Sequence, residues 1–201
     1  MINKIVIVNY GVGNLRSVKK AFEKAGAEVE ISNDIEEIKA ASKLVLPGVG
    51  NFKVGMSKLL SSGLVDVLKE QVQLKKKPIL GICLGMQLMT KRSEEGNIEG
   101  LNWIEAETLK FKIDYKVPHI GWNTLKNKSI KLLENIDDDK EFYFTHSYYV
   151  KVLDEKIPHV KTKYGIDFHS GFQFENIYGF QFHPEKSYEP GIKLIQNFIN
   201  I

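Results

Sequence analysis

The residue with the clearest chemical potential is Cys83, the single cysteine of a 201-residue chain. It lies between Gly81 and Gly85, after a strand-forming run and before a helix-forming one. Glycines on both sides permit the sharp turn that exposes the nucleophile in Gly-x-Ser-x-Gly elbows, and the start of the next helix would favour a thiolate. A lone cysteine without such glycines is more often a small buried residue. The pattern therefore predicts a nucleophilic thiol.

The candidate base for this thiol is His183, at the end of the alternating run 180–183 (FQFH). Alternate residues of a strand share a face, so we expect His183 to point away from the phenylalanines and Pro184 to end the strand. Glu185 follows, where its carboxylate can hold the imidazole in one tautomer. A metal site or a surface ion pair would use the same residue types, but no second ligand cluster accompanies them. The pattern favours a Cys83, His183 and Glu185 triad, with no metal ion and no cofactor.

A third element is the loop at residues 47–50 (PGVG), directly after an apolar strand. The carboxyl ends of parallel strands meet at one edge of a sheet, so we expect this loop beside Cys83. The backbone N–H groups of Val49 and Leu84 would then face a developing oxyanion. A simple loop of turn residues is the alternative interpretation.

Two glycine motifs of nucleotide-binding proteins do not fit this chain. The turn at residues 11–16 (GVGNLR) follows the first strand, but Arg16 replaces the third glycine of the dinucleotide fingerprint. The chain also lacks a Gly-x-x-x-x-Gly-Lys phosphate loop, which argues against ATP-driven amination within it.

The elements that must position these residues follow an alternating order in the first half of the chain. Apolar strand-like runs and amphipathic runs alternate up to residue 77. Strands are expected at residues 4–9, 27–32 and 43–46. Helices are expected at residues 14–25 and 35–40 and in two further segments before residue 77. Unbroken apolar strands indicate a parallel sheet covered on both faces. Residues 103–182 contain aromatic, alternating strands, and a last helix is expected at about 190–199. The sequence predicts one α/β domain over residues 1–201, with antiparallel strands added to a largely parallel sheet.

Composition sets limits on location and partners. The chain is 43% apolar and 26% charged, contains no apolar run long enough to span a bilayer, and opens without a secretory leader. We therefore expect a cytoplasmic protein that does not bind a membrane. The net charge is only +3, and the lysines at 75–77 have no interleaved aromatic residues, so nucleic-acid binding is not expected. These lysines would instead meet the end of a helix before Pro78.

Taken together, these residues resemble the class I glutamine amidotransferases, and the resemblance covers essentially the whole chain. Within that family they are most similar to the glutaminase subunits of imidazole glycerol phosphate synthase. The segments that carry this similarity are residues 9–18 (NYGVGNLRSV), 46–52 (LPGVGNF), 117–123 (VPHIGWN), 142–148 (FYFTHSY) and 181–187 (QFHPEKS).

The resemblance implies a reaction and a substrate. Cys83 would attack the side-chain amide of L-glutamine, His183 would move the proton, Glu185 would orient His183, and water would resolve a glutamyl thioester. It also implies the residues that hold glutamine, which are Gly48, Gly50, Gln87, Ser147 and Tyr148. Val49 would supply its N–H only after its loop rearranges.

The resemblance further implies a partner. In this family a (β/α)8-barrel cyclase receives the ammonia and forms a heterodimer with the glutaminase. The residues that match its interface are Asn14, Pro118, His119, Trp122, Tyr143 and Lys186. His159 and His169 have no such match and are interpreted as surface or packing residues.

Alternatives remain at this point. Residues 101–108 and 165–171 depart from the pattern of the histidine-pathway enzymes, which leaves open a related glutaminase that supplies ammonia for amidination of a surface-polysaccharide sugar. A stand-alone cysteine hydrolase of γ-glutamyl bonds would need no partner. A non-catalytic binding module is disfavoured, because all three triad positions and both elbow glycines are present.

Overall fold

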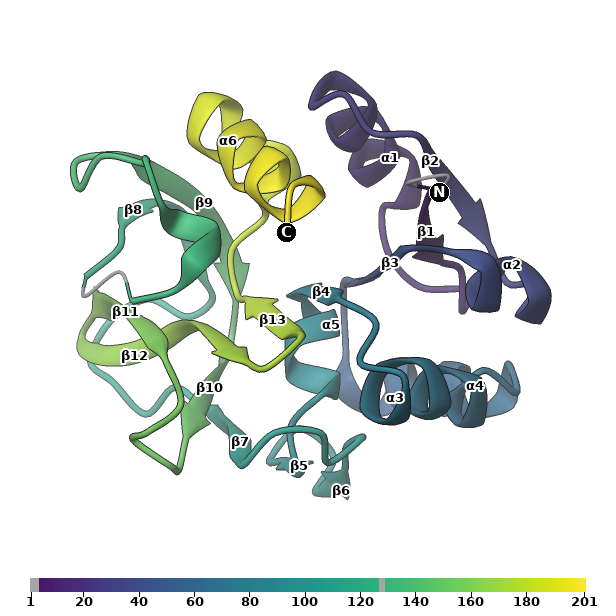
Figure 1. The fold of residues 1–201 in the computed structure, drawn as a ribbon. Helices are drawn as coiled ribbons and strands as arrows, with labels where there is room; N and C mark the ends of the chain where they lie inside the picture. The colour runs from purple at the N-terminus through teal and green to yellow at the C-terminus, as the bar shows by residue number, and fades with distance from the viewer. Residues whose placement is uncertain (1–3, 127–128) are drawn as a thin grey trace.

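One continuous sheet runs through the chain and carries helices on two sides (Figure 1). The computed structural model describes residues 4–126 and 129–201. Residues 1–3, which open the stretch considered above for a secretory leader, therefore lie outside the described part. None of the described helices is long and apolar enough to cross a membrane.

The parallel part of the sheet contains the strands expected from apolar runs. Neighbours pair in the spatial order β2 (Val29–Ser32), β1 (Ile5–Val8), β3 (Lys43–Gly48), β4 (Ile79–Cys83) and β13 (Ile177–Phe180). Every residue of β1, β3, β4 and β13 is buried, because helices cover both faces. The last of these strands comes from the far end of the sequence and lies beside the strand that ends in Cys83.

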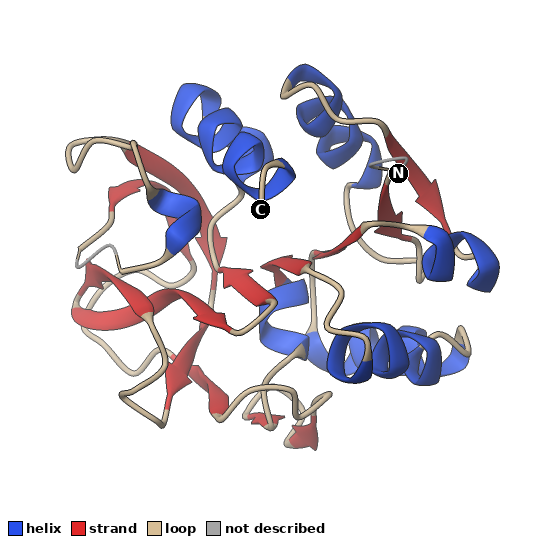
Figure 2. Ribbon diagram, in the orientation of Figure 1, coloured by secondary structure: helices blue, strands red, loops and turns tan. Residues whose placement is uncertain are grey.

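The antiparallel part continues from β13. The strands follow in the order β12 (Ile166–Phe174), β10 (Tyr148–Val152), β7 (Ala106–Lys110), β5 (Arg92–Ser93) and β6 (Ile98–Glu99), with β11 (His159–Tyr164) on β12. A separate antiparallel pair consists of β8 (His119–Thr124) and β9 (Glu141–His146). This pair lies at the end of the molecule away from β1 and β2, as Figure 2 shows in red.

The helices divide between the two faces of the sheet. On one face lie α1 (Leu15–Lys24) and α6 (Tyr188–Ile199), and on the other α2 (Ile35–Ala40), α3 (Phe52–Ser61), α4 (Val65–Lys69) and α5 (Leu84–Leu88). A π-helical turn, Glu70–Leu74, continues α4, and 3-10 turns lie at Lys131–Leu133 and Pro184–Lys186. Side-chain oxygens of Asn14, Asp34 and Asn51 cap the starts of α1, α2 and α3.

Two apolar cores result from the alternation along the strands. Val6 and Val8 pack into the core under α2 to α5, whereas Ile5 and Ile7 pack into the core under α1 and α6. The second core also contains Phe142 and its neighbours in β9, so the separate strand pair is anchored there. The predicted fold class is confirmed: an α/β domain with helices on both faces of a largely parallel sheet and antiparallel strands added.

One predicted strand end is wrong. The last parallel strand ends at Phe180, before His183. The reason is a change of partner: the N–H of Gln181 donates to Ser170 O of β12 at 2.9 Å, whereas the N–H of His183 donates to Tyr143 O of β9 at 2.9 Å. The chain thus crosses from the main sheet to the separate pair within two residues. Smaller differences concern α6, which begins at Tyr188, and β3, which extends to Gly48.

The lysines at 75–77 all have partners in the structure. The first two form ion pairs with glutamates. Lys77 Nζ donates to the carbonyl oxygens of Ile38, at 2.9 Å, and Lys39, at 2.8 Å, in the last turn of α2. The run does meet a helix end, as expected, because Lys75 is the C-cap residue of the preceding π-helical turn; Lys77 additionally contacts the end of α2.

Candidate active site

The predicted catalytic segments follow three adjacent parallel strands, β3, β4 and β13, and lie at one edge of the sheet. In the register of these strands Gly48 lies opposite Cys83, and Ile82 lies opposite Phe180. The loop after β3, the end of β4 and the segment after β13 therefore converge, as expected for carboxyl ends of parallel strands. A cavity of about 350 Å³ opens at this point, and both Cys83 and His183 line it.

Cys83 has a backbone conformation that is unusual for a residue with a side chain. Its φ is +53° and its ψ is −110°, at the junction where β4 ends and α5 begins. The flanking glycines are required by close packing: a Cβ on Gly85 would overlap Leu46 O, and one on Gly81 would lie 2.9 Å from Met86 N. Strained backbone of this kind gathers at functional sites. The structure thus has the turn that the glycines predicted.

His183 and Glu185 form a buried pair. His183 Nδ1 lies 2.7 Å from Glu185 Oε1, and both side chains are almost completely buried. The carbonyl oxygen of His183 accepts from Ser187 Oγ at 2.6 Å, and the hydroxyl of Ser187 also accepts from Tyr143 N. The imidazole is therefore held by its ring and by its backbone, and Nδ1 carries the hydrogen. Nε2 has no hydrogen-bond partner of good geometry among the described residues and remains for Cys83.

The surroundings of His183 favour its charged form. Burial of the ring acts to lower its pKa, but the charge and hydrogen bonding of Cys83, followed by those of Glu185, act in the opposite direction. Together they raise the pKa of His183 to about 10. The arrangement therefore stabilises the imidazolium form of His183 beside Cys83, the predicted nucleophile.

Two glutamine amides connect the thiol to the cavity wall. Gln181 Nε2 donates to Cys83 Sγ at 3.6 Å, and its Oε1 accepts from Gln87 Nε2 at 2.9 Å. Both glutamines are buried. Gln87 was expected to bind substrate, whereas Gln181 was not singled out as a site residue. The sequence feature that could have identified Gln181 is its position two residues before His183, because alternate residues of an extended segment point to the same side.

The cavity gathers most of the residues predicted to bind substrate. Those that line it are Val49, Gly50, Leu84, Gln87, Ser147 and Tyr148. Gly48 lies behind the cavity instead, where a Cβ would come within 2.6 Å of Tyr10 Oη and 2.9 Å of Leu84 Cβ. The Tyr10 hydroxyl in turn donates to Pro47 O at 2.7 Å, so it helps to hold the loop at residues 47–50 in place. The binding role of these residues remains a prediction.

The cavity also contains residues that the sequence did not indicate as substrate contacts, namely Glu95, Pro118, Thr145 and His146. Glu95 adds a carboxylate, and its Oε2 accepts from the N–H of Phe52 at 2.6 Å. Nothing in the sequence near Glu95 pointed to this role, because only the tertiary fold brings the segment after β5 to the cavity. Pro118 was predicted as a partner contact and lines the cavity as well.

Four side chains next to the site form an exposed aromatic cluster, which consists of Trp122, Tyr143, Lys186 and Tyr188. The Trp122 ring stacks on Tyr188 with centroids 5.2 Å apart and lies 5.7 Å from Tyr143. Lys186 Nζ lies 5.4 Å from the centroid of Tyr143. Trp122 is 42% exposed and Tyr188 77%. Three of these residues were predicted at a partner interface, and Tyr188 is an addition.

The other three residues predicted at the interface are not part of this cluster: Pro118 lines the cavity, and Asn14 and His119 have other contacts. Asn14 caps α1, where its Oδ1 accepts from Ser17 N at 3.4 Å. His119 is buried, and its ring contacts His146 rather than the surface. Its side chain can therefore influence a partner only through the residues that cover it.

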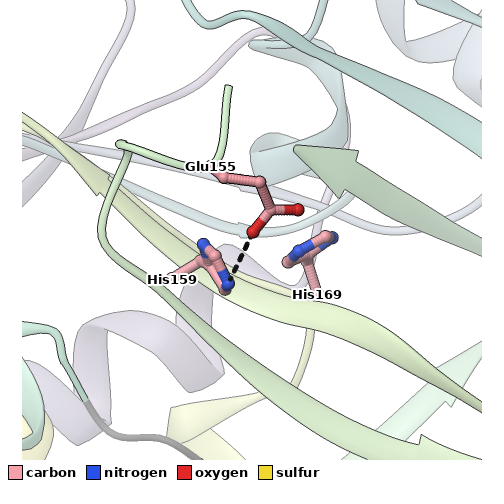
Figure 3. A group of neighbouring side chains, drawn as sticks. All are labelled: Glu155, His159 and His169. Atoms are coloured by element: carbon pink, nitrogen blue, oxygen red, sulfur yellow. Dashed lines mark ion pairs between the residues drawn. The ribbon is translucent and has the colours of Figure 1, made fainter. Parts of the chain in front are cut away.

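A second group of titratable side chains comes from two antiparallel strands, β11 and β12, and from the turn before β11 (Figure 3). Glu155, His159 and His169 each place a possible ligand atom within 4.8 Å of the others. His159 Nδ1 donates to a backbone carbonyl, so Nε2, which lies 3.8 Å from Glu155 Oε2, keeps its lone pair. His169 Nδ1 instead accepts from Val152 N at 3.2 Å, so its Nε2 carries the hydrogen. The group thus offers two lone-pair ligands, fewer than a zinc site uses. Buried His169 fits the packing role expected for it.

Comparison with known proteins identifies relatives over nearly the full chain. The sequence model of a family described as "Glutamine amidotransferase class-I" matches residues 6–201. Imidazole glycerol phosphate synthase subunit HisH 2 of Methanococcus maripaludis is 48% identical over 97% of this chain and 98% of its own. Subunit HisH 1 of Campylobacter jejuni is 49% identical over 98% of this chain and 100% of its own. Subunit HisH of Archaeoglobus fulgidus is 47% identical over 98% of each.

Solved structures share the fold at low sequence identity. A putative GMP synthase protein from Thermoplasma acidophilum superposes with a TM-score of 0.75 at 21% identity, over 100% of this chain and 94% of its own. PurLQS from Thermotoga maritima gives a TM-score of 0.76 at 16% identity, over 100% of this chain and 99% of its own. These two matches concern the fold alone.

Proposed function

Because this chain belongs to the class I glutamine amidotransferases, we propose that it is the glutaminase subunit of an imidazole glycerol phosphate synthase. In this role it hydrolyses L-glutamine to glutamate and passes ammonia to a (β/α)8-barrel cyclase. The observation that carries the proposal is the buried arrangement of Cys83, at the end of β4, with His183 and Glu185, which follow the adjacent β13. The chain also matches subunits of that name over nearly their whole length.

The geometry supports a covalent mechanism. Cys83 Sγ attacks the side-chain carbonyl carbon of glutamine, and the imidazolium of His183 gives its proton to the departing ammonia. Water then attacks the thioester as His183 accepts its proton, which releases glutamate and restores the thiolate. Glu185 holds the Nδ1–H of His183, so that Nε2 faces the reacting atoms.

The cavity offers complementary groups for glutamine. The backbone N–H of Leu84 and, after its loop rearranges, that of Val49 serve as oxyanion donors. Gln87, together with the backbone at Gly48, Gly50, Ser147 and Tyr148, holds the substrate. Glu95 is a carboxylate in the cavity wall, and it matches the α-ammonium group of an amino acid. No cofactor and no metal ion take part in this reaction.

The exposed aromatic cluster supports docking of a partner beside the cavity. Trp122 and Tyr143 are large aromatic side chains of the kind that anchor protein interfaces, and Lys186 adds a charge beside them. Asn14, Pro118 and His119 complete the region assigned to the partner, with His119 beneath its surface. In the proposed heterodimer the barrel covers this region and receives ammonia from the cavity.

We place this activity in one glutamine amidotransferase domain, residues 1–201, in the cytoplasm. The main sheet and the β8–β9 pair share an apolar core, which unites the described residues. A free thiol nucleophile suits a reducing compartment. Neither nucleic acid nor membrane is part of the proposed function, since the lysines at 75–77 are engaged within the protein.

The decisive experiment measures ammonia and glutamate release from L-glutamine by the purified chain, alone and with barrel proteins from the same cell. We expect slow hydrolysis alone and strong stimulation by a barrel partner with its ligand bound. The Cys83→Ala variant should lose turnover and still form the complex. Its substantial residual turnover would show that the nucleophile is misassigned.

The same assay separates the alternatives. Full activity of the isolated chain would favour a stand-alone γ-glutamyl hydrolase. Absence of hydrolysis under all conditions, with intact complex formation, would favour a binding module. Stimulation by a barrel that transfers the ammonia to a sugar would identify the polysaccharide pathway instead of histidine biosynthesis.

A further inference from the structure

A row of hydrogen bonds runs from strand β8 to the wall of the cavity. Asn123 Nδ2 lies 3.4 Å from His119 Nε2, and His119 Nδ1 lies 3.0 Å from His146 Nε2. The row ends at the carbonyl oxygen of Tyr148, 2.7 Å from His146 Nδ1. The catalytic steps proposed above use neither of these two rings, although His146 lines the cavity.

The direction of each hydrogen bond is fixed by the ends of the row. The Tyr148 carbonyl can only accept, so His146 carries its hydrogen on Nδ1 and accepts at Nε2. His119 must then donate from Nδ1 and accept at Nε2 from the Asn123 amide. The orientation of this amide is set as well, because its Oδ1 accepts from Thr124 N at 2.9 Å. Both imidazoles therefore have one tautomer, and all four of their nitrogens are satisfied.

Both rings are buried and packed among aromatic neighbours. His119 stacks on Phe144 and Tyr164, with centroids 4.8 and 4.0 Å away, and His146 lies 5.2 Å from Phe168. Burial lowers the pKa of His119 to about 4 and that of His146 to about 3. Both rings are accordingly neutral near pH 7, which is the state that the row requires.

At the cavity end the row meets the amides next to the thiol. The Tyr148 carbonyl also accepts from Gln87 Nε2 at 3.2 Å. The same amide group donates to Gln181, which in turn donates to Cys83 Sγ. A displaced Tyr148 carbonyl would therefore move the Gln87 amide that faces the substrate.

At the other end the row lies beneath an exposed surface. The side chains of Ile120 and Trp122 on β8 are exposed, whereas His119 and Asn123 on the same strand belong to the row. Alternate residues of a strand point to opposite faces, so the exposed pair and the hydrogen-bonded pair share one rigid backbone. A contact that shifts β8 from outside would shift the row.

We propose that His119 and His146 are positioning residues for glutamine binding. They hold the Tyr148 carbonyl, and through it the Gln87 amide, and they tie this wall of the cavity to the exposed face of β8. The inference rests on the proposed function and assigns that function two residues that do not touch the reacting atoms.

Nitrogen-15 NMR of the full-length chain with labelled histidine tests the row independently of catalysis. We expect both rings to show the signature of the Nδ1–H tautomer, with an unprotonated Nε2, at neutral pH. An Nε2–H tautomer or a charged ring at either position would overturn the proposal. This measurement uses the wild-type protein, so it does not depend on the folding of any variant.

Calorimetric titration of L-glutamine into the full-length Cys83→Ala chain tests the consequence. Adding His119→Phe keeps an aromatic ring in the stack but removes both nitrogens of the row. We expect the Kd for glutamine to rise at least about tenfold. The buried acceptor His146 Nε2 loses its hydrogen-bond donor, so His146 no longer holds the Tyr148 carbonyl in place. In the complex with an active thiol, the same substitution should raise KM for glutamine by a similar factor and change kcat less.

His159→Phe is the matched control, since this ring lies outside the row and should leave the Kd unchanged. An unchanged Kd in the His119→Phe variant, when the Cys83→Ala parent binds glutamine, would overturn the positioning role alone. If the Cys83→Ala parent does not bind glutamine, the proposed function fails, and this inference fails with it.

Discussion

At the scale of single residues, the site depends on mutual support between Cys83 and His183. Burial acts to lower the pKa of the His183 imidazole, but Cys83 and Glu185 raise it. The protonation of His183 therefore cannot be assessed without Cys83.

This dependence predicts a shift in titration. In the wild-type chain, where the pKa of His183 is about 10, the ring should keep its proton well above neutral pH. In Cys83→Ala two of the raising influences are lost while burial remains, so the pKa should fall and the ring should deprotonate at lower pH. Proton NMR titration of the His183 ring measures both values. An unchanged pKa would contradict the proximity of thiol and ring.

A second prediction concerns the residue that orients the base. Glu185→Gln preserves the shape of the side chain but removes its charge and its preference for the Nδ1–H tautomer. We expect kcat for glutamine hydrolysis to fall by about 10²-fold or more, with little change in KM, because this base contributes on that order. The control is Glu189→Gln, an exposed residue of α6. Equal activities of the two variants would remove Glu185 from the mechanism.

How far the site could be predicted depended on whether a residue has a local signature. Cys83 lies between glycines, and His183 and Glu185 are separated by one residue, so residue types and spacing sufficed to propose them. Glu95 and Gln181 are ordinary polar residues whose importance comes from the fold. The pairing of His119 with His146 could not be predicted from the sequence, because its hydrogen bond joins two strands whose residues are 27 positions apart.

At the scale of elements, the sharp passage from β4 to α5 is the feature on which the nucleophile depends. The start of α5 packs so closely on β3 that no side chain fits at Gly85. The contact is with a backbone carbonyl, which a rigid, buried strand cannot easily withdraw. Strand, turn and helix therefore act as one unit that presents Cys83.

Gly85→Ala should disrupt this unit. We expect a loss of about 3 kcal/mol or more in the free energy of unfolding, from overlap of the new Cβ with Leu46 O. Urea denaturation followed by circular dichroism measures it. Gly26→Ala is the control, since its φ of +95° imposes strain but nothing lies within 4 Å, and a loss of about 1 kcal/mol is expected. Equal losses would show that α5 can withdraw from β3.

Elements in the first half of the chain could be predicted well because parallel strands buried on both faces are continuously apolar. The end of β13 could not, because the change of partner from β12 to β9 is a long-range event without a local breaker before Pro184. The order of the antiparallel strands was also out of reach. It depends on pairings such as β10 with β7, which the intervening sequence does not encode locally.

At the scale of the whole molecule, the cavity and the aromatic cluster lie side by side on one region of the surface. Pro118 lines the cavity, and β8, which begins at the next residue, carries Trp122. A partner that contacts Trp122 would thus contact the strand that begins next to the cavity-lining Pro118. The molecule is arranged so that docking and substrate access affect the same strand.

Trp122→Ala should weaken the complex with the barrel partner without unfolding the chain. Loss of an exposed aromatic anchor at an interface is expected to raise the Kd about tenfold or more, whereas the melting temperature should change little. Isothermal titration calorimetry measures the affinity. Leu74→Ala, at an exposed apolar residue after α4, is the control. If both variants bind equally well, the partner docks elsewhere.

The position of β13 beside β4 has a consequence for the time course of synthesis. Translation produces β3 shortly before Cys83, but β13 follows roughly a hundred residues later, which at ribosomal speed is on the order of 5–20 s. During that interval the apolar edge of β4 lacks its neighbour and is a natural target for chaperones. The nascent chain also carries its nucleophile without the base. A chain that ends before β13 therefore lacks both the strand beside β4 and His183, the proposed base, and it is expected to leave glutamine unhydrolysed.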